Sequence, residues 1–174
     1  MKKLYSIISI FIVFLSFANG QSKSESNKQC NIFKQIVELV SDDKLNTIEG
    51  SEFVPKYFKV FSWNKCYTAT VKIPTAQEIV IFQESNKNKY SCILNDYGAD
   101  EAKAKEDLKK IVKIFSDCLN VKDVKITNQP FSTRKDNTFC NFFYQHCRIQ
   151  ISTFQSGITQ TWVTLIDLEN TTDH

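Results

Sequence analysis

The sequence is poor in glycine and histidine: its 174 residues include four glycines and two histidines. Four scattered glycines exclude a glycine-rich loop that binds phosphates. Two histidines leave little basis for histidine catalysis or a multi-histidine metal centre. The motifs G-x-S-x-G and H-E-x-x-H, the P-loop and the EF-hand loop are also missing. These absences favour a protein without catalytic activity, and they predict neither a metal nor a cofactor.

The composition is that of a globular domain with nearly balanced charge. Hydrophobic residues make up 42% of the chain and charged residues 24%, and the length fits one domain. Lys and Arg total 22 against 19 for Asp and Glu. Removal of the first 20 residues takes two lysines away and leaves 20 basic against 19 acidic residues. A nearly neutral chain argues against nucleic acid as a partner, because nucleic acid requires a basic patch.

The first 20 residues have the three parts of a secretory signal peptide. Lys2 and Lys3 are followed by an apolar run at residues 4–18, and Ala18 and Gly20 then occupy the −3 and −1 positions of a cleavage site. The apolar run is shorter than the ~20 residues of a membrane-spanning helix. We therefore expect export to the periplasm or the extracellular space, with no membrane association after cleavage.

The remaining chain divides into three parts. Residues 21–29 are polar and are expected to form a flexible lead-in, residues 30–169 a single α+β domain, and residues 170–174 a loose tail. The tail begins with Asn170-Thr-Thr, which matches the acceptor pattern for N-glycosylation.

Six cysteines in an exported chain predict three disulfides. Fifteen connectivities are possible. Spacing favours the pairs Cys30–Cys118, at the ends of two helices, Cys66–Cys92, across a sheet, and Cys140–Cys147, which closes a short loop. The alternative is a metal site that combines His146 with the last of these pairs, but the spacing C-x-x-C of a zinc knuckle is absent.

Hydrophobic periodicity predicts two helices and several strands. The first helix starts near Cys30 and ends before Gly50, and the second is capped by Asp100 and runs to Leu119. Strands are expected at residues 67–73, 79–82, 90–94, 147–154 and 158–168, with a further short strand at 121–126. The order α-β-β-β-α-β-β predicts an antiparallel sheet of five to six strands with both helices packed on one face. No internal repeat is evident.

Two aromatic segments are candidates for partner contacts. Aromatic residues and arginine are enriched at binding hot spots, and the candidate contacts are Phe142, Phe143, Tyr144, Arg148 and Trp63. The alternative is that these rings fill the core.

The chain resembles a loose family of small exported, uncharacterised α+β proteins of Gram-negative bacteria in its landmarks Cys30, Gly50, Trp63, Pro74, Cys118-Leu119 and Trp162. This resemblance implies no activity. The element order also resembles that of type III secretion chaperones, whose domains bind other proteins. The sequence therefore predicts an exported, disulfide-stapled binding protein without catalytic activity, for example an inhibitor or immunity-type partner of another exported protein. The alternatives are a small exported hydrolase and a carrier of a small apolar ligand.

Overall fold

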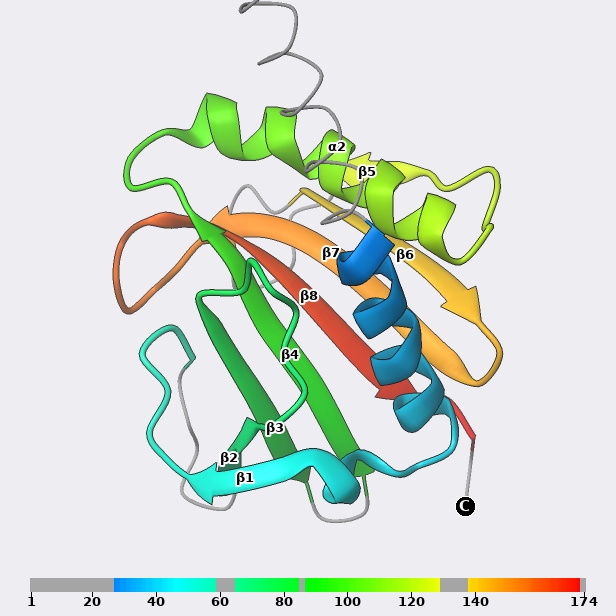
Figure 1. The fold of residues 1–174 in the computed structure, drawn as a ribbon. Coiled ribbons are helices and arrows are strands. Elements are labelled where there is room, and N and C mark those ends of the chain that lie inside the picture. The colour runs from blue at the N-terminus through cyan, green and yellow to red at the C-terminus, as the bar shows by residue number, and fades with distance from the viewer. Residues whose placement is uncertain (1–26, 59–64, 85–86, 129–137, 173–174) are drawn as a thin grey trace, which may run out of the picture.

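The computed structural model describes residues 27–58, 65–84, 87–128 and 138–172. In these ranges two helices accompany a sheet of eight strands (Figure 1). The first helix covers residues 27–41 and is followed by the 3-10 helix η1 (Leu45–Ile48), and the second helix is α2 (Glu101–Cys118). The strands are β1 (Glu49–Glu52), β2 (Lys65–Ala69), β3 (Glu78–Glu84), β4 (Lys87–Asp96), β5 (Ile126–Asn128), β6 (Thr138–Tyr144), β7 (Cys147–Gln155) and β8 (Trp162–Asn170). The predicted α+β class is confirmed, whereas the expected five to six strands are too few.

The eight strands form one antiparallel sheet in the order β1-β2-β3-β4-β8-β7-β6-β5. Two meanders, β1–β4 and β5–β8, meet where β4 pairs with β8, and α2 connects them (Figure 1). The central position of β8 agrees with its sequence, because a strand that is apolar on both faces is typical of a sheet interior.

Two strands were not expected from the sequence. Strand β1 has the sequence Glu-Gly-Ser-Glu and carries no apolar side chain that would indicate it. Gly50, expected to end the first helix, lies in this strand, where a Cβ would come within 2.3 Å of the Thr68 Oγ1. Strand β6 contains the aromatic segment that was assigned to a disulfide-closed loop.

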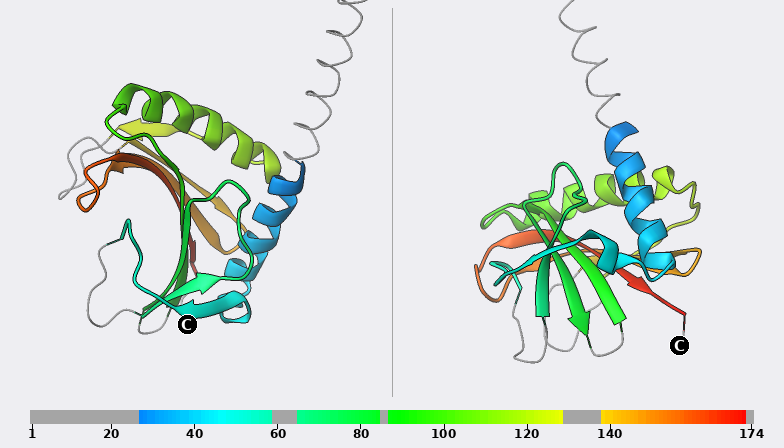
Figure 2. Two further views of the ribbon diagram at one scale, coloured as in Figure 1. Left: turned by 60° about the vertical axis from the view of Figure 1, so that its left-hand side comes forward. Right: turned by 60° about the horizontal axis from the view of Figure 1, so that its bottom comes forward.

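Both helices pack on one face of the sheet, as predicted (Figure 2). The first helix contributes Phe33, Ile36, Val37 and Val40 to a core that also contains the inward side chains of α2 and of the central strands. The rings of Phe33 and Phe115 join the two helices, with centroids 4.3 Å apart. Burial of each such side chain contributes about 1.5–3 kcal/mol to folding.

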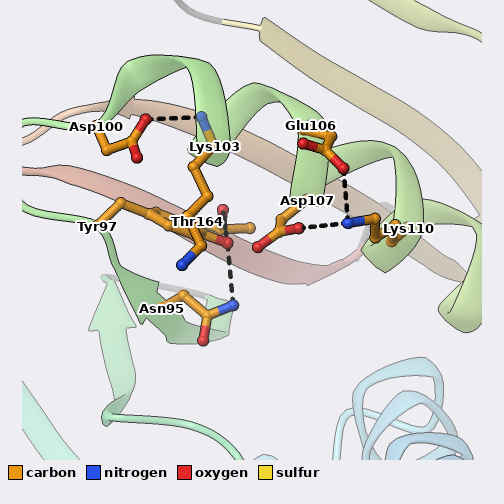
Figure 3. A network of polar contacts seen from close by, with 8 residues as sticks. All are labelled: Asn95, Tyr97, Asp100, Lys103, Glu106, Asp107, Lys110 and Thr164. Atoms are coloured by element: carbon orange, nitrogen blue, oxygen red, sulfur yellow. Dashed lines mark hydrogen bonds and ion pairs between the residues drawn. The ribbon is translucent and has the colours of Figure 1, made fainter.

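Helix α2 begins where the sequence predicts it. The Asp100 carboxylate accepts a hydrogen bond from the backbone N–H of Lys103 at 2.9 Å (Figure 3). Beneath this first turn, the Tyr97 hydroxyl accepts hydrogen bonds from the Asn95 amide at 3.0 Å and the Thr164 hydroxyl at 3.5 Å. These polar groups support the start of α2, while its later turns lie on the apolar core.

One of the three predicted disulfides is present. Cys30 and Cys118 are bonded, with Cα atoms 5.4 Å apart. The bond links the beginning of the first helix to the end of α2, as the spacing predicts.

The predicted pair Cys66–Cys92 is wrong. The two residues lie on β2 and β4, which are separated by β3. Cys66 pairs with Phe82 and Cys92 with Ile79. These two β3 residues are three positions apart and point to opposite faces of the sheet, so the two thiols do as well.

The predicted pair Cys140–Cys147 is wrong for a different reason. Cys140 pairs with Ile151, which is four residues along β7 from Cys147. Four residues of a strand span about 13 Å, whereas a disulfide needs Cα atoms within about 7 Å. Both residues are buried and free. Burial raises the pKa of the Cys140 thiol to about 11 and that of the Cys147 thiol to about 12.

The structure contains a repeat, so the expectation of no internal repeat is wrong. Residues 27–96 and residues 101–170 both consist of a helix followed by a four-stranded meander. The last strands of the two halves, β4 and β8, pair antiparallel. Because corresponding strands pair antiparallel and both helices lie on one face, an approximate two-fold axis relates the halves.

The helices of the two halves are also similar in sequence. Residues 34–42 (KQIVELVSD) and 109–117 (KKIVKIFSD) share five of nine residues. The same shift of 75 positions relates their buried residues, which are Phe33, Ile36, Val37, Val40 and Ser41 in the first helix and Leu108, Ile111, Val112, Phe115 and Ser116 in α2. Each helix therefore presents the same face to the sheet.

Candidate binding site

The second face of the sheet, which neither of the described helices covers, contains an apolar region and a polar region. The apolar region is a small buried cluster of Tyr57, Ile93, Phe154, Val163 and Leu165. The polar region, called the polar strip below, consists of Lys89, Ser91, Arg148, Asp167 and Glu169 on strands β4, β8 and β7.

The segment after β1 covers the apolar region. The Glu78 carboxylate accepts hydrogen bonds from the backbone N–H groups of Lys56, at 2.6 Å, and Tyr57, at 3.0 Å. The Tyr57 hydroxyl donates to the Asp96 carboxylate at 2.9 Å. Phe58 packs edge-on against Phe82, with ring centroids 5.3 Å apart. These contacts hold residues 56–58 against the sheet.

Asp96 helps to hold this segment, because its charged carboxylate accepts the hydrogen bond from Tyr57. Partial burial tends to raise the pKa of its carboxyl, but hydrogen bonds from the Gly98 backbone N–H and from the Tyr57 and Thr161 side chains outweigh that effect and hold the pKa below its ordinary value. Burial, in turn, raises the pKa of Tyr57. Asp96 is therefore charged and Tyr57 neutral at pH 7, which suits their hydrogen bond.

The polar strip is built from pairs of residues that face each other across strands. Lys89 pairs with Glu169, which pairs with Arg148, which pairs with Phe143. This row crosses four neighbouring strands, β4, β8, β7 and β6, at about 4.8 Å per step. Arg148 and Glu169 form an ion pair within it.

The next row of the strip contains a buried carboxylate. Asp167 accepts a hydrogen bond from the Ser91 hydroxyl at 2.5 Å and forms an ion pair with Lys89 at 2.9 Å. Ser91 is fully buried and Asp167 is nearly so. The Ser91 and Lys89 contacts satisfy both carboxylate oxygens, as a buried charge requires.

The predicted partner contacts are divided between the two faces. Phe142 is only 5% exposed and belongs to the core under the helices, and Tyr144 packs against the same core. Phe143, by contrast, is 61% exposed and lies opposite Arg148 on the helix-free face. Trp63 lies outside the described residues.

Sequence reasoning missed Lys89, Ser91, Asp167 and Glu169. The available signal was Asp167, a charged residue inside the apolar strand at residues 162–168. A charge in an interior strand requires a partner, and the neighbouring strands would have been the places to search for one.

The metal alternative depends on His146. This residue lies exposed in the turn between β6 and β7, and its backbone carbonyl accepts a hydrogen bond from the backbone N–H of Thr171 at 2.8 Å. The hairpin separates Cys140 from Cys147 along the sheet. Among the described residues, no three His, Cys, Asp or Glu side chains gather to hold a metal ion.

A pocket of about 250 Å³ lies at the β1–β2 side of the sheet. Its lining is partly apolar and partly polar and comprises Phe53, Thr68, Lys72, Ala76, Gln77, Glu78 and Ile79. Glu78 therefore contributes both to this pocket and to the attachment of residues 56–58.

Within the described ranges, no helix has the length and apolar character needed to cross a membrane. Comparisons with protein-family models, with curated proteins and with solved structures give no match for the chain.

Proposed function

We propose that the chain is an exported binding protein without catalytic activity, of the inhibitor or immunity type, and that it contacts another exported protein through Phe143 and Arg148. The observation that carries the proposal is the exposure of the Phe143 ring next to the Arg148–Glu169 ion pair. An exposed aromatic ring beside an arginine is a typical hot-spot arrangement.

Three further features support this function. Residues 1–20 have the pattern of a signal peptide, and the Cys30–Cys118 bond suits an oxidising compartment. Phe143 and Arg148 lie on the paired strands β6 and β7, so the ring needs little ordering when a partner binds.

The test is capture of a partner from the exported fraction of the producing cells by the purified chain, residues 21–174. Phe143→Ala should reduce capture at least tenfold and leave the circular dichroism spectrum unchanged. Ile114→Ala is the matched control, because Ile114 is exposed on α2, on the other side of the sheet. Equal capture by all three proteins would contradict the proposal, as would unfolding of the Phe143→Ala variant.

A carrier of a small apolar ligand is the second candidate, and the pocket beside Phe53 favours it. Its volume lies slightly below the usual range for ligand pockets. Hexanol should then shift the NMR signals of Ala76 and Ile79, and Ala76→Leu should remove the shifts by filling the pocket. Shifts that persist in this variant would contradict a carrier role for this pocket.

A further inference from the structure

We propose that Lys89 and Arg148 together recognise a side-chain carboxylate on the partner, next to an apolar side chain that packs on Phe143. This inference rests on the proposed function and names the chemistry of the partner segment. Asp167 and Glu169 act as positioning residues for the two cations, and Ser91 holds Asp167.

The first argument comes from the two halves of the fold. Phe82-Gln83 at the end of β3 corresponds to Phe154-Gln155 at the end of β7. The same shift of 72 positions relates Ile79 to Ile151, and these residues pair with Cys92 and Ile166 respectively. Cys92 and Ile166 also pair with each other, so the approximate two-fold axis passes beside this pair.

The residues on either side of the axis should therefore be alike, and they are not. One neighbouring pair is Ile93–Leu165, which is apolar and belongs to the small buried cluster. The other is Ser91–Asp167. The Ser91–Asp167 pair thus occupies the place that the apolar pair Ile93–Leu165 holds on the other side of the axis.

Packing does not explain the polar pair. Burial of a carboxylate and a cation carries a desolvation cost that an apolar pair avoids, and replacement of buried ion pairs by apolar residues is often neutral or stabilising. The Ile93–Leu165 pair shows that this face of the sheet accommodates a pair of apolar side chains beside the axis. The segment with Tyr57 packs on the apolar pair, whereas Lys89 beside the polar pair remains 28% exposed, so the polar side of the axis is the side open to a partner.

The arrangement presents donors to the outside. The Lys89 side chain is 28% exposed against 12% for Asp167, and the Arg148 side chain is 39% exposed against 33% for Glu169. In each ion pair the base is thus more accessible than the acid. Lys has three N–H donors and Arg has five, so both cations retain donors after bonding to their acids. An incoming carboxylate matches these donors, and Phe143 beside Arg148 offers the apolar contact.

The experiment uses residues 21–174, the chain expected after removal of the signal peptide, labelled with ¹⁵N and titrated with the peptide acetyl-Ala-Leu-Glu-Ala-amide. Its counterpart with Gln in place of Glu is the neutral comparison. The Glu peptide should shift the amide signals of Arg148, Glu169 and their neighbours and should bind at least tenfold more tightly than the Gln peptide. Loss of charge-assisted hydrogen bonds accounts for a difference of this size.

Two double variants complete the test. Lys89→Met with Asp167→Asn should weaken binding of the Glu peptide about tenfold without loss of stability in urea. Lys113→Met with Asp117→Asn removes an exposed ion pair on α2 and should leave binding unchanged.

The outcomes separate this inference from the proposed function. Equal binding of the two peptides, shifts elsewhere on the protein, or no shifts at millimolar peptide would overturn recognition of a carboxylate. A Lys89→Met/Asp167→Asn variant that is markedly less stable would show that the pair is structural. If Phe143→Ala still abolishes capture in any of these cases, the proposed function stands, and only the inference that the partner segment carries a carboxylate is contradicted.

Discussion

The Asn170 side chain holds the end of the first helix, and replacing it with Asp should destabilise the fold. Asn170 is the last residue of β8 and is buried, although the sequence assigns it to a loose tail. Its amide nitrogen donates to the backbone carbonyls of Val40 at 2.9 Å and Ser41 at 3.2 Å. These carbonyls belong to the last turn of the 27–41 helix, beyond the reach of its own N–H donors, and the Val40 carbonyl also accepts a hydrogen bond from the Asp43 backbone N–H at 3.1 Å.

The substitution Asn170→Asp keeps the shape and removes both donors. Each lost hydrogen bond costs about 1 kcal/mol. A negative charge at a helix C-terminus opposes the helix dipole and adds about 0.5–1 kcal/mol. The total loss is about 3 kcal/mol, which shifts the midpoint of urea unfolding by about 1.5 M for a slope of ~2 kcal/mol/M.

Urea unfolding at pH 7, monitored by circular dichroism with the disulfide intact, measures this loss. Asn46→Asp is the matched control, because Asn46 is exposed and the same change there should cost less than ~0.5 kcal/mol. Acidification should shrink the deficit, since a protonated carboxyl regains a donor. Equal stability of the two variants would refute the capping role.

The same contacts occupy the amide nitrogen that N-glycosylation at Asn170-Thr-Thr would modify, so the folded protein should not be glycosylated there.

Three further predictions concern the cysteines, Asp96 and Gly50. Thiol titration in denaturant should find four thiols without reductant and six after reduction, because only Cys30 and Cys118 are bonded among the described cysteines; two or no free thiols before reduction would contradict the pairing. The lowered pKa of Asp96 stabilises the fold above the ordinary carboxyl pKa, and this stabilisation should be lost as the pH falls through the folded pKa, below about 4. The Asp96→Asn variant should be less stable at pH 7. In urea melts between pH 5 and pH 2, its free energy of unfolding should depend less on pH than that of the unchanged protein. Gly50→Ala should cost about 1–3 kcal/mol because its Cβ would lie 2.3 Å from the Thr68 Oγ1; a second change, Thr68→Ala, should recover part of that loss in the same assay.

The elements that the sequence predicts correctly are those with a strong local signal. Helix α2 has Asp100 as its cap and apolar residues at steps of three and four, and the local sequence alone determines both. Strand β8 has apolar residues on both faces as far as Ile166, which places it inside the sheet. In contrast, the wrong pairing of Cys66 with Cys92 depends on strand order and on which face each residue occupies, and both are properties of the whole sheet.

The candidate site was predictable only in part, for a related reason. Phe143 and Arg148 lie five residues apart and meet across a tight hairpin, so their neighbourhood has a local signal. The contact between Ser91 and Asp167 joins residues 76 positions apart in sequence. It exists because β8, the last strand, pairs with β4 at the junction of the two halves, and no periodicity in either strand indicates that pairing.

The junction between the halves combines an apolar pair and a polar pair on one face of the sheet. An apolar side chain at position 93 or 165 joins a buried cluster, whereas the polar residues at positions 91 and 167 require each other and Lys89. Under the proposed function, binding rather than stability maintains these polar residues. The disulfide lies away from this junction, between the two helices on the opposite face. It links residues separated by 88 positions. In the chain-entropy model such a link raises the free energy of the unfolded chain by about 4–5 kcal/mol. That stabilisation exceeds the cost of a polar pair, so a fold cross-linked at its helices can retain buried charges on its other face.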